Sequence, residues 1–177
     1  TQLLEKRREL KEKMRFLPTS DQYKELLKLD VPILQQYVES VNALAEVLRG
    51  STSRGLASIY EYARRVKESD RFKFLSEQVN NFNNANYIEL GVTINAIREV
   101  KKTTFLDASL TKLKRSTLSK IVSSFHKPKW GHILNPAWKW MMSYDTLVAM
   151  AFSDLVEDSR EQIQATTRLI GDVEFYT

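Results

Sequence analysis

The segment from residue 135 to residue 156 is the most apolar part of the chain and limits the possible fold more than any other stretch. Asn135 and Pro136 form a helix-start signal, because asparagine accepts a backbone N–H and proline needs no donor in the first turn. Apolar side chains then recur at helical spacing around most of the helix circumference. Three charged residues interrupt them, which argues against a membrane span. We therefore predict that residues 136–156 form the central helix of a bundle.

The composition favours a single all-α domain covering residues 1–177. Hydrophobic residues make up 42% of the sequence, and there are only five glycines and four prolines. Few residues of the turn-forming types favour long helices, so we predict a bundle of about seven or eight helices. There is no cysteine, which excludes disulfide bonds and cysteine-ligated zinc. The chain begins within a helical pattern, so we expect an excised fragment of an intracellular protein, cytoplasmic by default.

The N-terminal third is expected to contain three separate helices. A heptad-like seam runs through residues 2–17, with Arg7 at one of its apolar positions. This helix either packs on the bundle or protrudes and binds a partner. A short helix should follow and end at Leu29. Asp30 and Pro32 then resemble the start of a new helix, because aspartate caps helices and proline is tolerated in the first turn.

The middle of the chain is also predicted to be helical. Five asparagines between residues 80 and 86 should end one helix, since asparagine competes for backbone hydrogen bonds. Asn86 and Glu89 have the spacing of a capping box for a helix that extends to Val100. Asp107 is then expected to cap a basic amphipathic helix.

Twelve apolar side chains from these helices are expected to form the core. The central helix should continue beyond Val156 with a thinner apolar seam up to Gly171. The predicted core consists of Val38, Val41, Leu44, Ile59, Leu75, Ile94, Leu118, Val122, Trp138, Met142, Val148 and Phe152.

Positive charge is concentrated between residues 98 and 140. This stretch holds ten lysines or arginines and two acidic residues, a local net charge of +8. The rest of the chain holds seventeen basic and twenty acidic residues, a net charge of −3. We expect the stretch to form a basic surface that binds an acidic partner or nucleic acid. The proposed binding residues are Arg98, Lys101, Lys102, Lys112, Lys114, Arg115, Lys120, Lys127, Lys129, Trp130 and Lys139.

No catalytic motif stands out, so the function expected from the sequence is non-enzymatic. His126 and His132 are separated by lysines, which oppose a bound cation, and two histidines do not complete a metal site. We expect no metal and no cofactor. The first hypothesis is a helical scaffold for protein–protein interaction. RNA or DNA binding and peripheral association with an anionic membrane are the alternatives, and a homodimer through the terminal helices is a further hypothesis.

Overall fold

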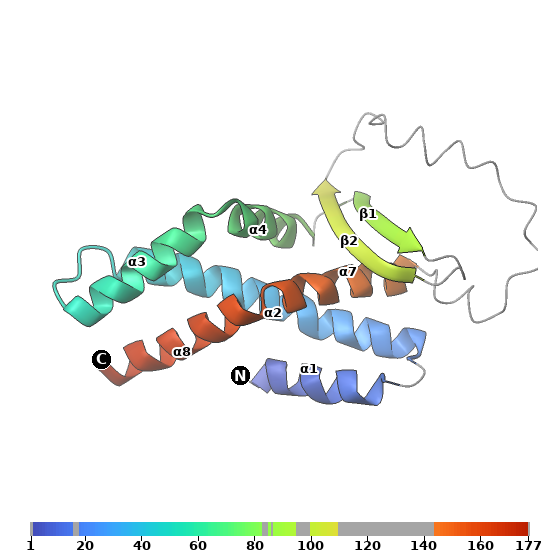
Figure 1. Cartoon of the computed structure of the whole chain (residues 1–177), viewed down its shortest axis with the longest axis horizontal. Helices are drawn as coiled ribbons and strands as arrows, with labels where there is room; N and C mark the ends of the chain where they lie inside the picture. Colours follow the sequence, from blue (N-terminus) through green and yellow to red (C-terminus); the bar gives the residue numbers. More distant parts are fainter. Residues whose placement is uncertain are drawn as a thin grey trace, which may run out of the picture.

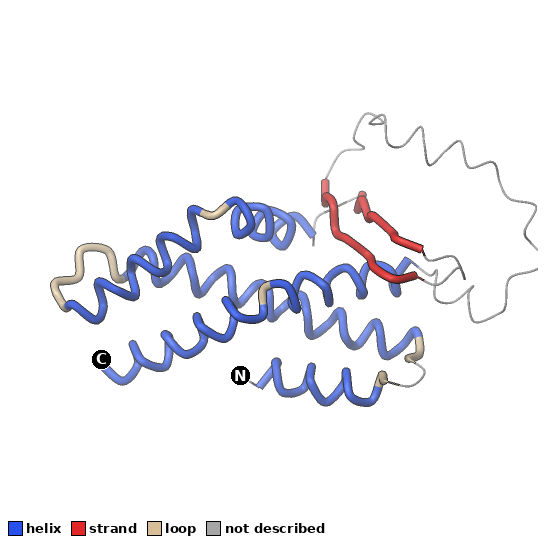
Figure 2. The backbone as a smooth tube through the Cα atoms, viewed as in Figure 1, coloured by secondary structure: helices blue, strands red, loops and turns tan. Residues whose placement is uncertain are grey.

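The computed structural model describes residues 2–15, 18–82, 85, 87–94, 100–109 and 144–176. In these residues the chain forms six helices and one antiparallel pair of strands (Figures 1 and 2). The elements are α1 (Gln2–Lys13), α2 (Ser20–Val47), α3 (Arg54–Glu68), α4 (Asp70–Phe82), β1 (Tyr87–Ile94), β2 (Val100–Ser109), α7 (Tyr144–Asp158) and α8 (Arg160–Tyr176). The prediction of a mostly helical chain is confirmed, whereas the predicted count of seven or eight helices and the absence of strands are not.

Helix α2 is the longest of the described helices and runs through the centre of the body (Figure 1). It buries apolar residues along most of its length and packs against α1, α3, α4, α7 and α8. Helix α7 lies along it and contributes Val148 and Phe152, which are 1% and 0% exposed. The predicted burial of both side chains is therefore confirmed. Of the other predicted core residues, Val38, Val41, Leu44, Ile59 and Leu75 are buried, and Ile94, Leu118, Val122, Trp138 and Met142 lie outside the side chains that the structure describes.

The predicted helix boundary at Asp30 and Pro32 is wrong, because α2 continues through both residues. Proline removes one backbone donor from a helix, and a helix this well packed tolerates that loss. The actual start signal is Thr19. Its side chain accepts a hydrogen bond from the Gln22 N–H, and the Gln22 side chain accepts one from the Thr19 N–H, which makes a capping box.

Residues 87–94 and 100–109 form strands, so the predictions of a helix up to Val100 and of a helix cap at Asp107 are wrong. In β1 the apolar residues recur at every second position from Ile88 to Ile94, which is the period of a strand. Several of them are β-branched and favour extended backbone. The alternation of apolar residues and the packing of the strands against the helices therefore determine the structure of this segment, and the capping-box spacing does not.

Two bulges turn β2 so that its buried side chains face the helices. The register shifts leave Leu106 and Lys101 without directly opposite partners on β1. As a result Phe105 and Ala108 are both buried, although they are three residues apart. Aromatic contacts and a backbone hydrogen bond fix the ribbon to the helices. The ring centroids of Phe105 and Phe152 are 5.1 Å apart, and Gln78 of α4 accepts a hydrogen bond of 2.7 Å from the Ala108 N–H.

The helix expected to continue beyond Val156 is instead divided at Ser159, between α7 and α8. The guanidinium of Arg71 donates a hydrogen bond to the Asp158 carbonyl at the end of α7. Helix α8 then packs its second half against α2 beside α3, where a smaller apolar cluster includes Leu44 and Ile59. The predicted helix after Asp107 from residue 110 onward, and residues 136–143 of the predicted central helix, lie outside the described residues.

Candidate functional site

The structure describes two of the eleven residues that the sequence proposes for binding. Lys101 and Lys102 lie on β2, Lys101 at a bulge and Lys102 with an exposed side chain. The other nine lie outside the described residues: Arg98, Lys112, Lys114, Arg115, Lys120, Lys127, Lys129, Trp130 and Lys139. A common basic surface of all eleven residues therefore stays a prediction.

Around Lys102 the described side chains are of mixed charge. Burial raises the pKa of Asp154 on α7, and the positive charge of Lys102 and a hydrogen bond from the Thr103 backbone lower it in part. The carboxylate of Asp154 thus stands close enough to Lys102 to offset some of its positive charge. The part of the predicted surface that lies on β2 is therefore less basic than its lysines alone indicate.

The most highly connected polar site of the described chain lies beneath α1 and centres on Arg7. Arg7 is 7% exposed, and its Nε donates to Oδ1 of Asp30 on α2 over 2.6 Å. Its Nη1 donates to Oε1 of Glu157 on α7 over 2.8 Å. Its Nη2 donates to both the carbonyl and the hydroxyl of Ser153, at 3.3 and 3.2 Å. One guanidinium thus joins α1 to α2 and α7.

Lys11, one helical turn after Arg7, completes the cluster. Its ammonium donates to Oε1 of Glu157 over 3.0 Å and to Oγ of Ser153 over 3.2 Å. With all groups ionised, the two cations balance the two carboxylates of Asp30 and Glu157. We call these five residues, Arg7, Lys11, Asp30, Ser153 and Glu157, the α1 clamp.

The two carboxylates of the α1 clamp differ in acidity because they differ in exposure. Complete burial raises the pKa of Asp30 to about 6, and attraction to Arg7 offsets only part of that rise. Partial burial also raises the pKa of Glu157, but hydrogen bonds from Arg7 and Lys11 outweigh it and lower the pKa to about 2. Oδ2 of Asp30 has no hydrogen-bond partner among the described residues, which agrees with its weaker acidity.

The sequence reasoning missed the α1 clamp, although one signal was present. Arg7 stands at an apolar position of a heptad-like seam, and a charge at such a position needs a buried counter-charge. Asp30 has the sequence pattern of a helix cap, so the sequence alone does not connect the two residues. No pattern in the sequence indicates that Glu157, 150 residues away from Arg7, is the second partner.

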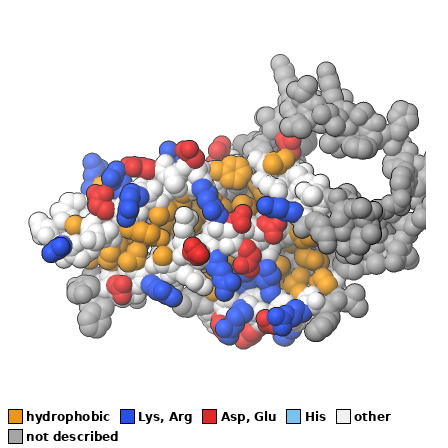
Figure 3. All heavy atoms as spheres, viewed as in Figure 1, with side chains coloured by type: hydrophobic (Ala, Val, Ile, Leu, Met, Phe, Trp, Pro, Cys, Tyr) orange, Lys and Arg blue, Asp and Glu red, His pale blue; other side chains and the backbone are white. Residues whose placement is uncertain are grey.

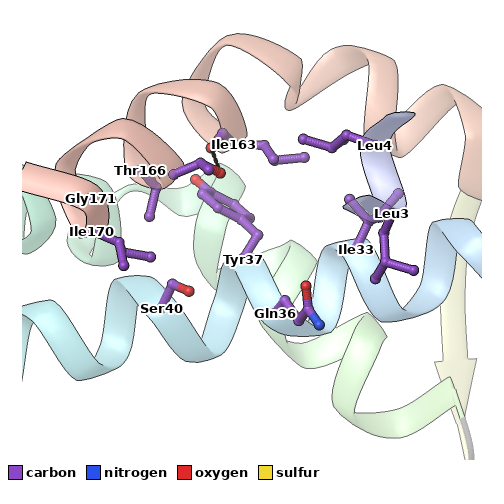
Figure 4. Close-up of a pocket in the computed structure, with 11 residues that line it drawn as sticks. Leu3, Leu4, Ile33, Gln36, Tyr37, Ser40, Ile163, Thr166, Ile170 and Gly171 are labelled. Carbon is purple, nitrogen blue, oxygen red and sulfur yellow. Dashed lines mark hydrogen bonds between the residues drawn. The ribbon is translucent and has the colours of Figure 1, made fainter. Parts of the chain in front are cut away.

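Open space surrounds α1 on more than one side. A pocket of about 370 Å³ lies between the start of α1, α2 and α8 (Figure 4). A wider depression of about 880 Å³ separates α1 from the junction of α7 and α8, and a smaller one of about 250 Å³ lies below the end of α1. Figure 3 shows acidic and basic side chains intermixed over this part of the surface.

The chemistry of the α1 clamp is that of a structural ion-pair network. The guanidinium of Arg7 does not give up its proton at physiological pH, and the carboxyl of Asp30 is 0% exposed. Among the described residues, no three histidine, cysteine or acidic side chains gather as a metal site would require. In the same part of the chain, no helix is long and apolar enough to cross a bilayer. The clamp therefore positions α1.

Comparison of the chain with models of protein families, with curated proteins and with solved structures finds no match.

Proposed function

We propose that the chain is a non-enzymatic helical binding module that engages an acidic protein partner through residues 98–140. The observation that carries the proposal is the charge of this segment, ten basic against two acidic residues, in a chain whose remainder is net negative. Protein surfaces normally intersperse both signs, and a run of one sign creates a potential that attracts the opposite charge.

The packing of the residues on either side of this segment is consistent with a binding role. Strand β2 precedes residues 110–143 and α7 follows them, and the two elements pack together through Phe105 and Phe152. The segment is thus joined at both ends to one firmly packed region of the helical body. A basic segment held in this way loses less conformational entropy on binding than a free tail.

RNA or DNA is the second candidate partner, and Trp130 is the observation that favours it. This tryptophan lies beside Lys127 and Lys129 in the sequence. Aromatic rings stack on unpaired bases, while neighbouring lysines bind phosphates, so this combination suits a single strand. An anionic membrane would attract the same lysines and is the third candidate.

Fluorescence anisotropy with matched probes tests the proposal. The probes are a labelled poly-glutamate peptide, a mixed-sequence RNA and a DNA duplex, each titrated from about 50 to about 500 mM salt, with phosphatidylserine vesicles in a parallel sedimentation assay. We expect the acidic peptide to bind at low salt and to dissociate as salt rises. Much tighter binding of RNA than of the acidic peptide at equal probe charge would identify nucleic acid as the class of partner. Absence of binding to every probe at low salt would refute a basic binding surface.

A further inference from the structure

Helix α1 is attached to the rest of the protein by a narrow apolar contact and by the polar groups of the α1 clamp. Only two of its described side chains, Arg7 and Leu10, are buried, whereas α2 buries nine. Leu3 and Leu4 pack against the main core but are only partly buried. A helix that belongs permanently to a core normally buries a broad apolar stripe. The attachment of α1 therefore depends on Arg7 to an unusual degree.

The spaces beside α1 show that its sides are not closely packed. Leu4 lines both the 370 Å³ pocket and the 880 Å³ depression, and Ile163 of α8 lines the same two spaces from the opposite wall. In Figure 4 these two side chains point toward each other across the pocket. The end of α1 borders a third space, whose lining includes Met14, Tyr23 and Met150. Along these open depressions α1 lacks the dispersion contacts that a helix enclosed on all sides would make.

Charge explains why α1 nevertheless lies in this position. Residues 2–15 carry six basic and three acidic side chains, a net charge of +3. Helix α7 carries four acidic side chains and no basic one, a net charge of −4. The α1 clamp joins these two helices at their closest polar contacts. The groove thus selects a helix by its positive charge and by an arginine that reaches Asp30.

These contacts depend on the sequence of α1 and not on its covalent connection to α2. The connector, residues 14–19, is short and contains Pro18. The same helix from another copy of the chain would offer the same arginine, lysine and leucines to the groove. Exchange of an identical element creates a symmetric dimer without any new contact surface.

We propose that the groove beneath α1 is a helix-exchange site, in which α1 of a second copy of the chain replaces the chain's own α1. The groove is formed by α2, α7 and α8, and its anchors are Asp30, Ser153 and Glu157. Two copies that exchange α1 reciprocally form a closed dimer. This inference does not depend on the binding partner of residues 98–140.

Engineered cysteines test the exchange directly, because the chain contains no cysteine of its own. Leu4→Cys and Ile163→Cys together in one chain should be joined by a short bismaleimide crosslinker, which spans the pocket between the two side chains and so verifies the seating of α1 beside α8. A chain with Leu4→Cys is then mixed with a chain carrying Ile163→Cys and treated with the same crosslinker. A crosslink between the two chains can form in the groove only when α1 has been exchanged.

The expected result is a covalent dimer with one chain of each kind, identified by mass spectrometry. Adding Arg7→Met to the Leu4→Cys chain should lower its yield at least about tenfold, because truncating one partner of a buried ion pair weakens docking strongly. The control for random collision is Leu4→Cys mixed with Lys67→Cys, whose position on α3 is exposed. Circular dichroism verifies that each variant is folded.

Three outcomes would overturn the proposal. The first is a double variant that is crosslinked within the chain while the mixed chains crosslink no better than the control pair. The second is a double variant that is not crosslinked, since α1 would then not lie beside Ile163. Light scattering on the unaltered chain gives independent support: the mass should rise above 20.6 kDa with concentration. A constant monomer mass up to the solubility limit would also contradict exchange.

Discussion

Replacing Arg7 with methionine should destabilise the protein by an amount that depends on pH. Methionine keeps most of the apolar stem but removes every donor that Arg7 offers to Asp30, Ser153 and Glu157. Removal of one partner from a buried ion pair typically costs about 3–5 kcal/mol, because the other charge stays buried without compensation. We expect a loss in this range at pH 7.5.

The pH dependence follows from Asp30. Its folded-state pKa, about 6, lies above its ordinary value of 3.8, so ionisation of this carboxyl opposes folding, and the effect disappears below about pH 4. Without Arg7, buried Asp30 should stay protonated up to pH 7.5. Compared with the unaltered protein, the variant that keeps Asp30 protonated loses about 1.4 kcal/mol of unfolding free energy for each pH unit above 6. At pH 7.5 this loss is about 2 kcal/mol. At pH 5 the extra cost is about zero, because Asp30 is then protonated in the unaltered protein as well.

Urea denaturation followed by circular dichroism at pH 7.5 and pH 5 measures the difference. The loss of unfolding free energy caused by Arg7→Met should be about 2 kcal/mol larger at the higher pH. In an Asp30→Asn background the pH dependence of that loss should vanish, since asparagine does not titrate. If the loss were equal at both pH values in the presence of Asp30, the reasoning about its burial would be refuted.

Substitutions at three further positions test the fold. Phe152→Ala removes a fully buried ring that contacts two other aromatic rings, and should cost about 3–5 kcal/mol in urea denaturation; a loss below about 1 kcal/mol would contradict its central position. Gln78→Leu leaves the buried Ala108 N–H without its acceptor and should cost about 1–3 kcal/mol; hydrogen exchange at that amide should accelerate, and unchanged protection would contradict the contact. Thr19→Ala removes the capping box with Gln22 and should cost about 1 kcal/mol, whereas Thr19→Ser should cost less than half as much.

The helical body could be predicted from the sequence because its signals are local. The apolar stripes of α2, α3, α4 and α7 recur at helical spacing, and glycine and asparagine mark the ends of α2 and α4, whereas α8 continues through Gly171. Gly50 after α2 adopts a positive φ of 79°, as expected for a glycine beyond a helix terminus. The capping-box spacing of Asn86 and Glu89 predicts a helix, whereas the alternation of apolar and β-branched residues after it indicates the strand that forms. The two bulges shift the register of β1 and β2, and the strands pack against helices that are distant in the sequence, which no local pattern contains.

The α1 clamp shows why long-range polar contacts could not be predicted from the sequence. The unusual position of Arg7 is visible in the sequence, but its partners come from helices that are 23 and 150 residues away. The structural role of Asp30 also depends on its burial, since an exposed aspartate at the same position could cap a helix. The basic segment 98–140 is the opposite case, because its charge is a property of the sequence alone and supports a binding surface only as a proposal.

The most direct measurement of the proposed function compares two charge-reversal variants in binding to the labelled poly-glutamate peptide at low salt. One variant changes Lys112, Lys114 and Arg115 to glutamate. The control changes three exposed basic residues on helices outside this segment to glutamate, namely Lys28, Lys67 and Arg168. Both variants have the same net charge, so any difference between them reports the position of the charges and not their number.

The account predicts that the first variant loses at least about tenfold in affinity while the control stays within about threefold of the unaltered chain. Circular dichroism should show that both remain helical. Equal losses in the two variants would mean that binding depends on overall charge alone. That result, or unchanged affinity in the first variant, would contradict a binding surface within residues 98–140.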